Sequence, residues 1–492
     1  MATTYIANEA RKLGLVPAGE DGTYFQDVPF TARAFSRRTV LKVDDRTIAG
    51  FTGVVALPLS RALPRSIDDA QVIFGGEWGD NAHSISQRQA SGRLVLFVAP
   101  NGLGRLTTNS ELPSAAGFAV VSGDTFTPEQ IAVGRTPVLT QRAQAGVDIA
   151  PATIIVTRSA AEALMGRSLD GVRLGAHGKR VQGNLVYDQA AVSSRNVIAV
   201  LPGTDPMLKG QYVALGAHSD HVGVRVNALD HDSLHLTNAR KYFAIDNPSG
   251  APLTEAQRAR RAMRLAAVKV NLDSIHAARP IRRDSIHNGA DDDGSGTVTL
   301  LEVAEAFAKG KVKPKRSLLF VWHTGEELGM LGSHWFVEHP TVPRDSIVAQ
   351  INIDMVGRGA ARDLAAGSDN YLQLVGSRRL STELGNLVES VNDAQKAPFT
   401  LDYAYDANGH RENIYCRSDH ANYARYGIPV VFFTTGMHGD YHQVTDEPQY
   451  IDYPHMARIG NFVFTLTNRL AELSHRPVVD KPKPDPKGAC RQ

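Results

Sequence analysis

The sequence is poor in several features that would by themselves assign it to a class of protein. It has only two cysteines, Cys416 and Cys490, so no disulfide framework is predicted and the redox compartment stays undetermined. No apolar run approaches the roughly 18 to 20 residues that a membrane span needs. The formal net charge of +2 gives no reason to expect nucleic acid or an anionic membrane as a partner.

The first residues, MATTYIANEARKLGL, lack the apolar core of a signal peptide. They have the pattern of an amphipathic helix over residues 3–12, and one interpretation is that a leader has been removed. The composition is that of an ordinary globular protein, with 42% hydrophobic and 21% charged residues. A length of 492 residues predicts more than one domain.

The sequence pattern changes along the chain. Residues 51–192 contain short alternating runs separated by Gly, Asp and Ser turns, which predict a small β-rich unit. From Asn196 onward the pattern is α/β, and nearly continuous apolar runs such as RSLLFVWHT and QINIDMVG are typical of strands buried on both faces. The predicted fold class is therefore α/β, with a mixed, mostly parallel central sheet flanked by helices and an inserted β-rich domain.

Residues 224–287 are rich in His, Asp and Arg and stand out from this pattern. Thr254 and Gln257 form a capping-box pattern that predicts a helix, and we expect its arginine face to be solvated. A partner or substrate surface is the alternative interpretation. Three histidines of the segment are expected to be solvated and not to be metal ligands: His231, His235 and His287.

Polar side chains suited to metal binding or catalysis follow several predicted strands. Ligands of open α/β sheets bind beyond the carboxyl ends of the strands. The candidates at these ends are His218, Asp220, His221, Glu326, Glu327, Asp354, Tyr441, His442 and Asp446, together with the acidic loop NGADDDGSG over residues 288–296. Each motif alone has a structural explanation, such as a capped turn or a solvated helix start. Asp354 is different, because an Asp within an apolar run is costly unless it is paired or bound to metal.

The chemistry of these side chains indicates zinc. Imidazole and carboxylate ligands without thiolate suit Zn²⁺ or a related transition metal at a catalytic site with an open position. Calcium and magnesium favour oxygen ligands alone, so the histidines argue against them. Five ligand side chains are too many for one tetrahedral ion, and they suit two ions that share a carboxylate, roughly 3.5 to 4 Å apart.

Taken in order, the motifs GAHSDHVG, GADDDGSG, HTGEELGMLGS, INIDMVG and DYHQVTDE resemble the co-catalytic di-zinc aminopeptidase family of metallopeptidase clan MH. Its relatives include bacterial leucyl aminopeptidases, glutamate carboxypeptidase and glutaminyl cyclases. The β-rich stretch resembles, in its pattern of short alternating runs and in its position, the protease-associated domain often inserted in this family. The resemblance implies a catalytic domain over residues 1–50 and 193–473 with an insertion at 224–287 near the cleft, a protease-associated-like domain over 51–192, and a disordered tail over 474–492.

The resemblance also implies a role for each candidate residue. One zinc ion would be bound by His218 and Asp354, the second by Glu327 and His442, and Asp292 would bridge both ions. Glu326 would be the general base, and Tyr441 would donate a hydrogen bond to the developing oxyanion. Asp220 and Asp446 would accept ring N–H groups and so orient the ligating histidines.

The implied activity is that of a zinc-dependent exopeptidase acting on the N-terminal bond of peptides with a free N-terminus. One alternative is a carboxypeptidase or dipeptidase that reads a C-terminal carboxylate through Arg358, Arg411 or Arg417. A non-catalytic receptor-like relative and a glutaminyl cyclase are further alternatives, which the full ligand set disfavours. The family resemblance implies a secreted or periplasmic location, and the sequence does not determine the oligomeric state. The long gap between His218 and Asp292 departs from simple family members, and the insertion within it could be a lid or an oligomer contact.

Overall fold

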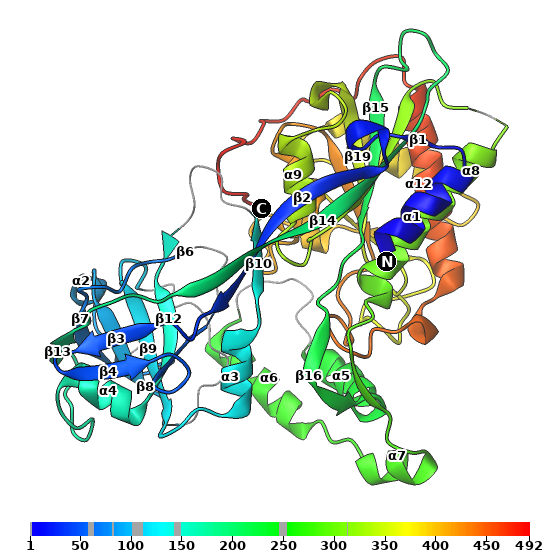
Figure 1. Ribbon diagram of the computed structural model, residues 1–492. Helices are drawn as coiled ribbons and strands as arrows, with labels where there is room; N and C mark the ends of the chain where they lie inside the picture. Colours follow the sequence, from blue (N-terminus) through cyan, green and yellow to red (C-terminus); the bar gives the residue numbers. More distant parts are fainter. Residues whose placement is uncertain are drawn as a thin grey trace. The chain divides into compact units, whose positions relative to one another are not determined.

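The computed structural model describes residues 2–57, 63–80, 83–100, 112–141, 149–245, 253–311 and 313–492 (Figure 1). The chain forms two compact units, unit 1 over Met1–Val28 and Ser194–Gln492 and unit 2 over Pro29–Ser193. Unit 2 therefore begins well before residue 51, where the sequence pattern placed its start. The reason is that Leu41 and Ile48, from the hairpin of β3 (Val40–Val43) and β4 (Arg46–Ala49), pack in the hydrophobic core of unit 2.

Unit 1 is built on a mixed sheet with the strand order β2-β14-β18-β15-β19-β22-β20-β21, and β1 pairs with β14. The strands are β1 (Val16–Pro17), β2 (Phe25–Phe35), β14 (Tyr187–Leu201), β15 (Tyr212–His218), β18 (Ser317–His323), β19 (Ile347–Ile353), β20 (Tyr371–Val375), β21 (Thr400–Asp402) and β22 (Val430–Thr434). The central strands β18, β15, β19 and β22 are parallel, whereas β14 and β20 pair antiparallel with their neighbours β18 and β22. The prediction of a mixed, mostly parallel sheet is confirmed.

Helices cover both faces of this sheet. They are α1 (Ala2–Lys12), α8 (Gly296–Lys309), α9 (Leu331–Glu338), α10 (Thr382–Asp393), α11 (His420–Ala424) and α12 (Tyr453–Glu472). Successive residues of a strand point to opposite faces. In β15, Val213 and Leu215 join the core formed with α1, α8, α10 and α12, and Ala214 joins the core formed with α9 and α11. This packing explains the continuous apolar runs of the sequence. Among the described helices, none combines the length and the apolar character needed to cross a bilayer.

The insertion consists of β16 (Val224–Asp230), α5 (His231–Ile245), α6 (Glu255–Ala267), α7 (Leu272–Ala278) and β17 (Arg283–Ile286), and its residues 246–252 lie outside the described ones. The capping box predicted at Thr254 is present, since its hydroxyl accepts the Gln257 amide at 3.3 Å. No residue of α6 is buried, so the arginine face is solvated, as expected. The prediction that His231 is solvated is wrong, because its side chain is fully buried.

Unit 2 contains a six-stranded sheet with the order β13-β7-β8-β9-β12-β5. Its elements, in chain order, are β5 (Val54–Leu57), β6 (Leu63–Pro64), β7 (Gln71–Glu77), α2 (Gln87–Ala90), β8 (Leu94–Val98), β9 (Gly117–Gly123), α3 (Pro128–Arg135), β10 (Val138–Gln141), β11 (Ile149–Ala150), β12 (Ala152–Thr157), α4 (Arg158–Met165) and β13 (His177–Arg180). Strands β7, β8, β9 and β12 are parallel, and both edge strands are antiparallel to their neighbours. That this unit is a protease-associated domain stays a prediction.

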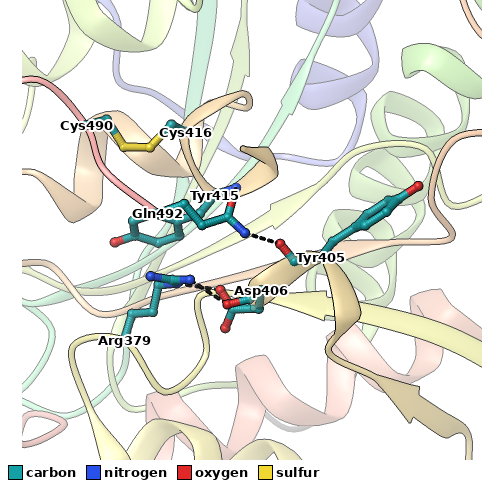
Figure 2. The surroundings of a disulfide bond; sticks show 7 residues. All are labelled: Arg379, Tyr405, Asp406, Tyr415, Cys416, Cys490 and Gln492. Carbon is teal, nitrogen blue, oxygen red and sulfur yellow. Dashed lines mark hydrogen bonds and ion pairs between the residues drawn. A yellow bond between two sulfur atoms is a disulfide. The ribbon is translucent and has the colours of Figure 1, made fainter. Parts of the chain in front are cut away.

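The C-terminal residues 474–492 have defined contacts, although their Pro/Lys-rich composition suggested disorder. A disulfide joins Cys490 to Cys416 across 74 positions of sequence, and the Gln492 side chain donates to the carbonyl of Tyr405 (Figure 2). The backbone amide of Lys481 donates to the carbonyl of Leu380 at 3.3 Å. Composition did not reveal these contacts because they depend on partners distant in sequence.

Candidate metal and catalytic site

Strand β15 ends at His218, whose side chain is buried among carboxylates. Its Nε2 lies 3.0 Å from Asp292 Oδ1 and 3.7 Å from Asp354 Oδ1. Its Nδ1 lies 3.0 Å from the backbone carbonyl oxygen of Asp220, which can only accept a hydrogen bond. Nδ1 therefore carries a proton, which leaves Nε2 as the ring nitrogen that could bind a metal ion. His218, Asp292 and Asp354 form one group able to hold a metal ion.

Of the three aspartates in the acidic loop, Asp292 is the one that faces two histidines. Its Oδ2 lies 3.0 Å from His442 Nε2, while its other oxygen faces His218. The neighbouring carboxylates are occupied by backbone amides: Asp293 accepts the amide of His218, and Asp291 accepts one from the loop after β19. Asp292 therefore belongs to two groups of possible metal ligands.

The two adjacent glutamates follow a break in the strand. Strand β18 ends at His323, and Gly325 has φ +66°, a left-handed conformation that favours glycine. The Asp220 carboxylate accepts the backbone amides of Glu326 at 3.1 Å and of Glu327 at 3.4 Å. This turn lets both glutamates face the same site, which adjacent residues of a regular strand cannot do.

A second metal-binding group forms around Glu327 and includes a histidine that the sequence interpretation had not assigned. Glu327 Oε2 lies 2.9 Å from His442 Nε2, and Oε1 lies 2.6 Å from His221 Nδ1. His221, Asp292 and Glu327 together meet the geometry of a metal site. The signal in the sequence was the second histidine of GAHSDH, three positions after His218. His221 and His442 both contact Glu327, so both are candidate ligands at this group.

Asp354 is held in place by Ser418, which lies just before α11. Ser418 Oγ donates to Asp354 Oδ2 at 2.7 Å and accepts from Asn352 Nδ2 at 2.8 Å. All three side chains are buried. This chain of hydrogen bonds fixes which Asp354 oxygen faces His218.

Asp220 and Asp446 support the site through the backbone. The Asp220 carboxylate is 3.8 Å from the His218 ring and, as described above, accepts the glutamate amides. Asp446 Oδ2 accepts the amides of Asp291 at 3.0 Å and of Asp292 at 3.1 Å. The expectation that these carboxylates accept ring N–H groups therefore differs from the contacts observed. They shape the turns that present Asp292, Glu326 and Glu327.

Tyr441 lies beside the second metal-binding group. Its ring stacks on His442 with centroids 3.9 Å apart, and its hydroxyl accepts a hydrogen bond from Arg417 Nη2 at 3.2 Å. Tyr441, Arg417 and Asp354 line one small cavity of about 50 Å³. The remaining lining is largely apolar and includes Met355 and Phe432.

The other two arginines considered for carboxylate binding have their own partners. Arg358 is buried and pairs with Asp363 at 2.9 Å and Asp440 at 3.3 Å. Arg411 pairs with Glu412 at 2.9 Å. Because Arg358 and its two carboxylate partners are all buried, the guanidinium group is already paired inside the protein and is not available to a substrate.

Burial and close contacts shift the pKa values of several of these groups. Burial alone would raise the pKa of Asp292, but its close contacts with the rings of His218 and His442 outweigh this effect and hold its pKa below the usual value. Burial lowers the pKa of His442, yet its contacts with Asp292 and Glu327 raise that pKa to about 9. Burial raises the pKa of Glu326 well above its usual value, and the nearby Asp354 acts in the same direction. Divalent cations would relieve this excess of buried negative charge.

The mixed α/β fold brings a cluster of His, Asp and Glu side chains to the carboxyl edge of its sheet. Residues 265–467 match the sequence model of Peptidase family M28. This segment contains Asp292, Glu326, Glu327, Asp354 and His442, whereas His218 lies before it.

The relatives are aminopeptidases by name. Leucine aminopeptidase 1 of Aspergillus fumigatus is 31% identical over 182 residues, which cover 34% of this chain and 43% of the relative. Leucine aminopeptidase 1 of Paracoccidioides brasiliensis strain Pb03 is 29% identical over 222 residues, covering 43% and 53%. The chain thus spans about half or less of the length of these relatives.

Solved structures with a similar chain path include an aminopeptidase from Aneurinibacillus sp. strain AM-1, with 16% identity and a TM-score of 0.48 over 98% of this chain and 90% of that one. A zinc aminopeptidase from Bacillus subtilis has 17% identity and a TM-score of 0.48 over 97% of this chain and 90% of that one.

Proposed function

We propose that this protein is a zinc-dependent aminopeptidase that hydrolyses the N-terminal bond of peptides. The observation that carries the proposal is the position of Asp292, with one carboxylate oxygen 3.0 Å from His218 and the other 3.0 Å from His442. A carboxylate shared by two metal-binding groups is the arrangement of a two-metal hydrolase. The match to Peptidase family M28 and the names of the relatives support the same activity.

The residues present fit zinc. His218 Nε2 is buried and makes no hydrogen bond with any residue in the described ranges, as expected for an atom that offers its lone pair to a metal. His218, Asp292 and Asp354 would hold one ion. Glu327, Asp292 and His442 would hold the other, with His221 as an additional candidate ligand. When bound, zinc would lower the pKa of a coordinated water and polarise the scissile carbonyl.

The remaining steps belong to the protein's own side chains. Glu326 is not a proposed metal ligand, and its carboxyl is close enough to His218, Asp354 and Asp292 for their charges to act on it. Glu326 accepts the proton of the attacking water and transfers it to the leaving amine, a contribution on the order of 10² to 10⁴-fold. Tyr441 donates its hydroxyl proton in a hydrogen bond to the developing oxyanion. The Arg417 contact orients that hydroxyl.

The cavity that contains Tyr441 and Asp354 is the proposed pocket for the first side chain of the substrate. Its lining of Met355, Ile414 and Phe432 favours an apolar side chain. Free α-amino groups would bind among the carboxylates of the site. Blocked peptides should therefore be poor substrates.

The second candidate function is a dipeptidase or carboxypeptidase of the same fold. It is favoured by one observation, that Arg417 lines the same cavity as Asp354 and could pair with a substrate carboxylate. Arg417 already contacts Glu412 and Tyr441, which argues for a structural role. Substitution of Arg417 by glutamine distinguishes the two candidate functions. If the protein is a dipeptidase, KM should rise strongly for dipeptides and should not rise for aminoacyl anilides.

The deciding experiment combines metal analysis with a substrate panel. Zinc content, and hydrolysis of aminoacyl anilides, N-acetylated analogues and C-terminally free dipeptides, are measured before and after chelation. We expect chelation to abolish hydrolysis, zinc to restore it, and anilides with apolar side chains to be the best substrates. If chelated protein cleaves every amide as before, the zinc peptidase assignment fails.

The location proposed is extracytoplasmic, in a secreted or periplasmic compartment. The disulfide between Cys416 and Cys490 supports it, because disulfides persist in oxidising compartments. Fractionation of the source cells tests this proposal, and a purely cytosolic protein would contradict it.

A further inference from the structure

His231, the first residue of α5, lies in a further cluster of possible metal ligands, formed by two residues of the insertion and one from the loop after His442. The group consists of His231, Asp284 from β17, and Glu447, each of which offers one ligand atom within 4.8 Å of the others. His231 and Glu447 are buried, and Asp284 is half-buried. Three protein ligands of nitrogen and oxygen type are a common set for zinc.

The His231 ring is oriented as a metal-binding histidine. Its Nδ1 donates to the Asp232 carboxylate at 3.1 Å, which leaves the lone pair on Nε2. That buried Nε2 lies 3.2 Å from Glu447 Oε2 but forms no hydrogen bond with any residue for which the structure gives coordinates. Two lone-pair atoms facing each other at this distance repel unless a proton on Nε2 or a metal cation lies between them. His218 Nε2 in the candidate catalytic site has the same combination of contacts.

The charges around the cluster leave room for a cation. Asp232, Asp284 and Glu447 supply three carboxylates, whereas two guanidinium groups contact them: Arg279 with Asp232 at 3.0 Å, and Arg282 with Glu447 at 2.9 Å. The arginine side chains are 62% and 45% exposed, so they lie on the solvent side of the buried His231. With a neutral imidazole, the net charge of the cluster is negative.

We propose that His231, Asp284 and Glu447 bind a further divalent cation of the zinc type, separate from the catalytic ions. The ligands come from two elements of the insertion and from the loop after His442, since Glu447 directly follows Asp446. A cation here would fasten the insertion to the loop that presents Asp292 and His442. The proposal does not depend on the peptidase activity.

The test is a count of zinc ions in full-length protein whose catalytic site has been disabled. An Asp292→Asn background removes the carboxylate shared by both catalytic groups, and zinc is assigned to the cluster only if it is lost when a cluster ligand is substituted as well. Elemental analysis of this variant should find about one zinc per chain. Adding Asp284→Asn or His231→Gln should remove it. Asp284 is half-buried, so its variant tests the site even if the His231 variant fails to fold.

His276→Gln is the matched control, because His276 pairs with Asp230 at 2.7 Å within the same insertion but is not part of the cluster. This variant should keep the zinc ion. Asp232→Asn should lower the zinc affinity about 10- to 100-fold, because it removes the partner that orients the ring. The proposal is overturned if the Asp292→Asn background holds no zinc, or if Asp284→Asn leaves its zinc content unchanged; the cluster is then an ion-pair network without metal.

Discussion

At the scale of single residues, each acidic side chain of the site has a separate task that its neighbours impose. Asp292 faces two histidines, while Asp291 and Asp293 are occupied by backbone amides. The two glutamates divide in the same way. Glu327 contacts the histidines, and Glu326 is left as a half-buried residue whose carboxyl pKa is raised by burial. Neighbouring carboxylates in one motif are thus not interchangeable.

Substitution of Glu326 by glutamine tests this division. The change removes a proton acceptor but preserves size, so kcat should fall on the order of 10² to 10⁴-fold while zinc content stays that of the parent. Steady-state kinetics and elemental analysis on the same preparation measure both. Loss of zinc in this variant would show that Glu326, and not Glu327, is the metal ligand. Glu327→Gln is the companion variant and should lose zinc.

Ser418 offers a second test at this scale. Ser418→Ala removes the hydrogen bond to Asp354 Oδ2, so zinc affinity should fall about 10- to 100-fold, as for other groups that orient a ligand. Competition with a chromogenic chelator measures the affinity. Ser381→Ala is the control: Ser381 is also buried, but its hydroxyl caps α10 by accepting the Leu384 amide. An equal loss of zinc affinity in both variants would contradict the role given to Ser418.

At the scale of elements, the site depends on how closely α8 approaches the sheet. Helix α8 begins at Gly296, directly after the acidic loop. A Cβ atom at Gly296 would come within 2.2 Å of both Asp293 Oδ1 and the carbonyl oxygen of Ile353. Glycine is required here by the space between the helix start and β19, so helix packing and loop position are coupled.

Gly296→Ala should therefore destabilise the protein, by about 1 to 3 kcal/mol for an overpacked position, and weaken zinc binding at the same time. Denaturant unfolding with and without zinc measures both effects. Gly460→Ala in α12 is the matched control, because its Cβ would meet only Thr299 Cγ2, at 3.4 Å. The control should be neutral or slightly stabilising, since alanine is a better helix former than glycine. A Gly296 variant that behaves like this control would refute the coupling.

At the scale of the whole molecule, a disulfide links the C-terminal segment to residues beside the candidate site. Cys416 immediately precedes Arg417, which contacts Tyr441, and Ser418, which contacts Asp354. The disulfide to Cys490 closes a loop of 74 positions. Cross-links over loops of this length restrict the unfolded chain and stabilise the folded one.

Cys490→Ser should lower the free energy of unfolding by about 2 to 4 kcal/mol. Thermal unfolding of the variant and of the parent, each with and without a reductant, measures the effect. The reductant should lower the melting temperature of the parent toward that of the variant and leave the variant unchanged. If the reductant leaves the melting temperature of the parent unchanged, and two free thiols are counted in the parent, the disulfide does not form.

The sequence by itself determined the elements and the chemistry of the candidate site, because both are local. Apolar runs marked the strands, and polar residues directly after them had to meet at one edge of a parallel sheet. The end of β18 before the glutamates was also predictable, since Gly325 lies between the strand and Glu326.

Only the tertiary structure decided which side chains face each other. His221 at Glu327, Ser418 at Asp354, the burial of His231 and the disulfide from Cys490 all depend on partners far away in the chain. The start of unit 2 at Pro29 likewise depends on which core the β3–β4 hairpin joins. Periodicity and composition indicate only whether a segment is a helix, a strand or a loop and which side it buries. The contacts within the site depend instead on how segments distant in the chain pack together, and this packing determines which side chains meet.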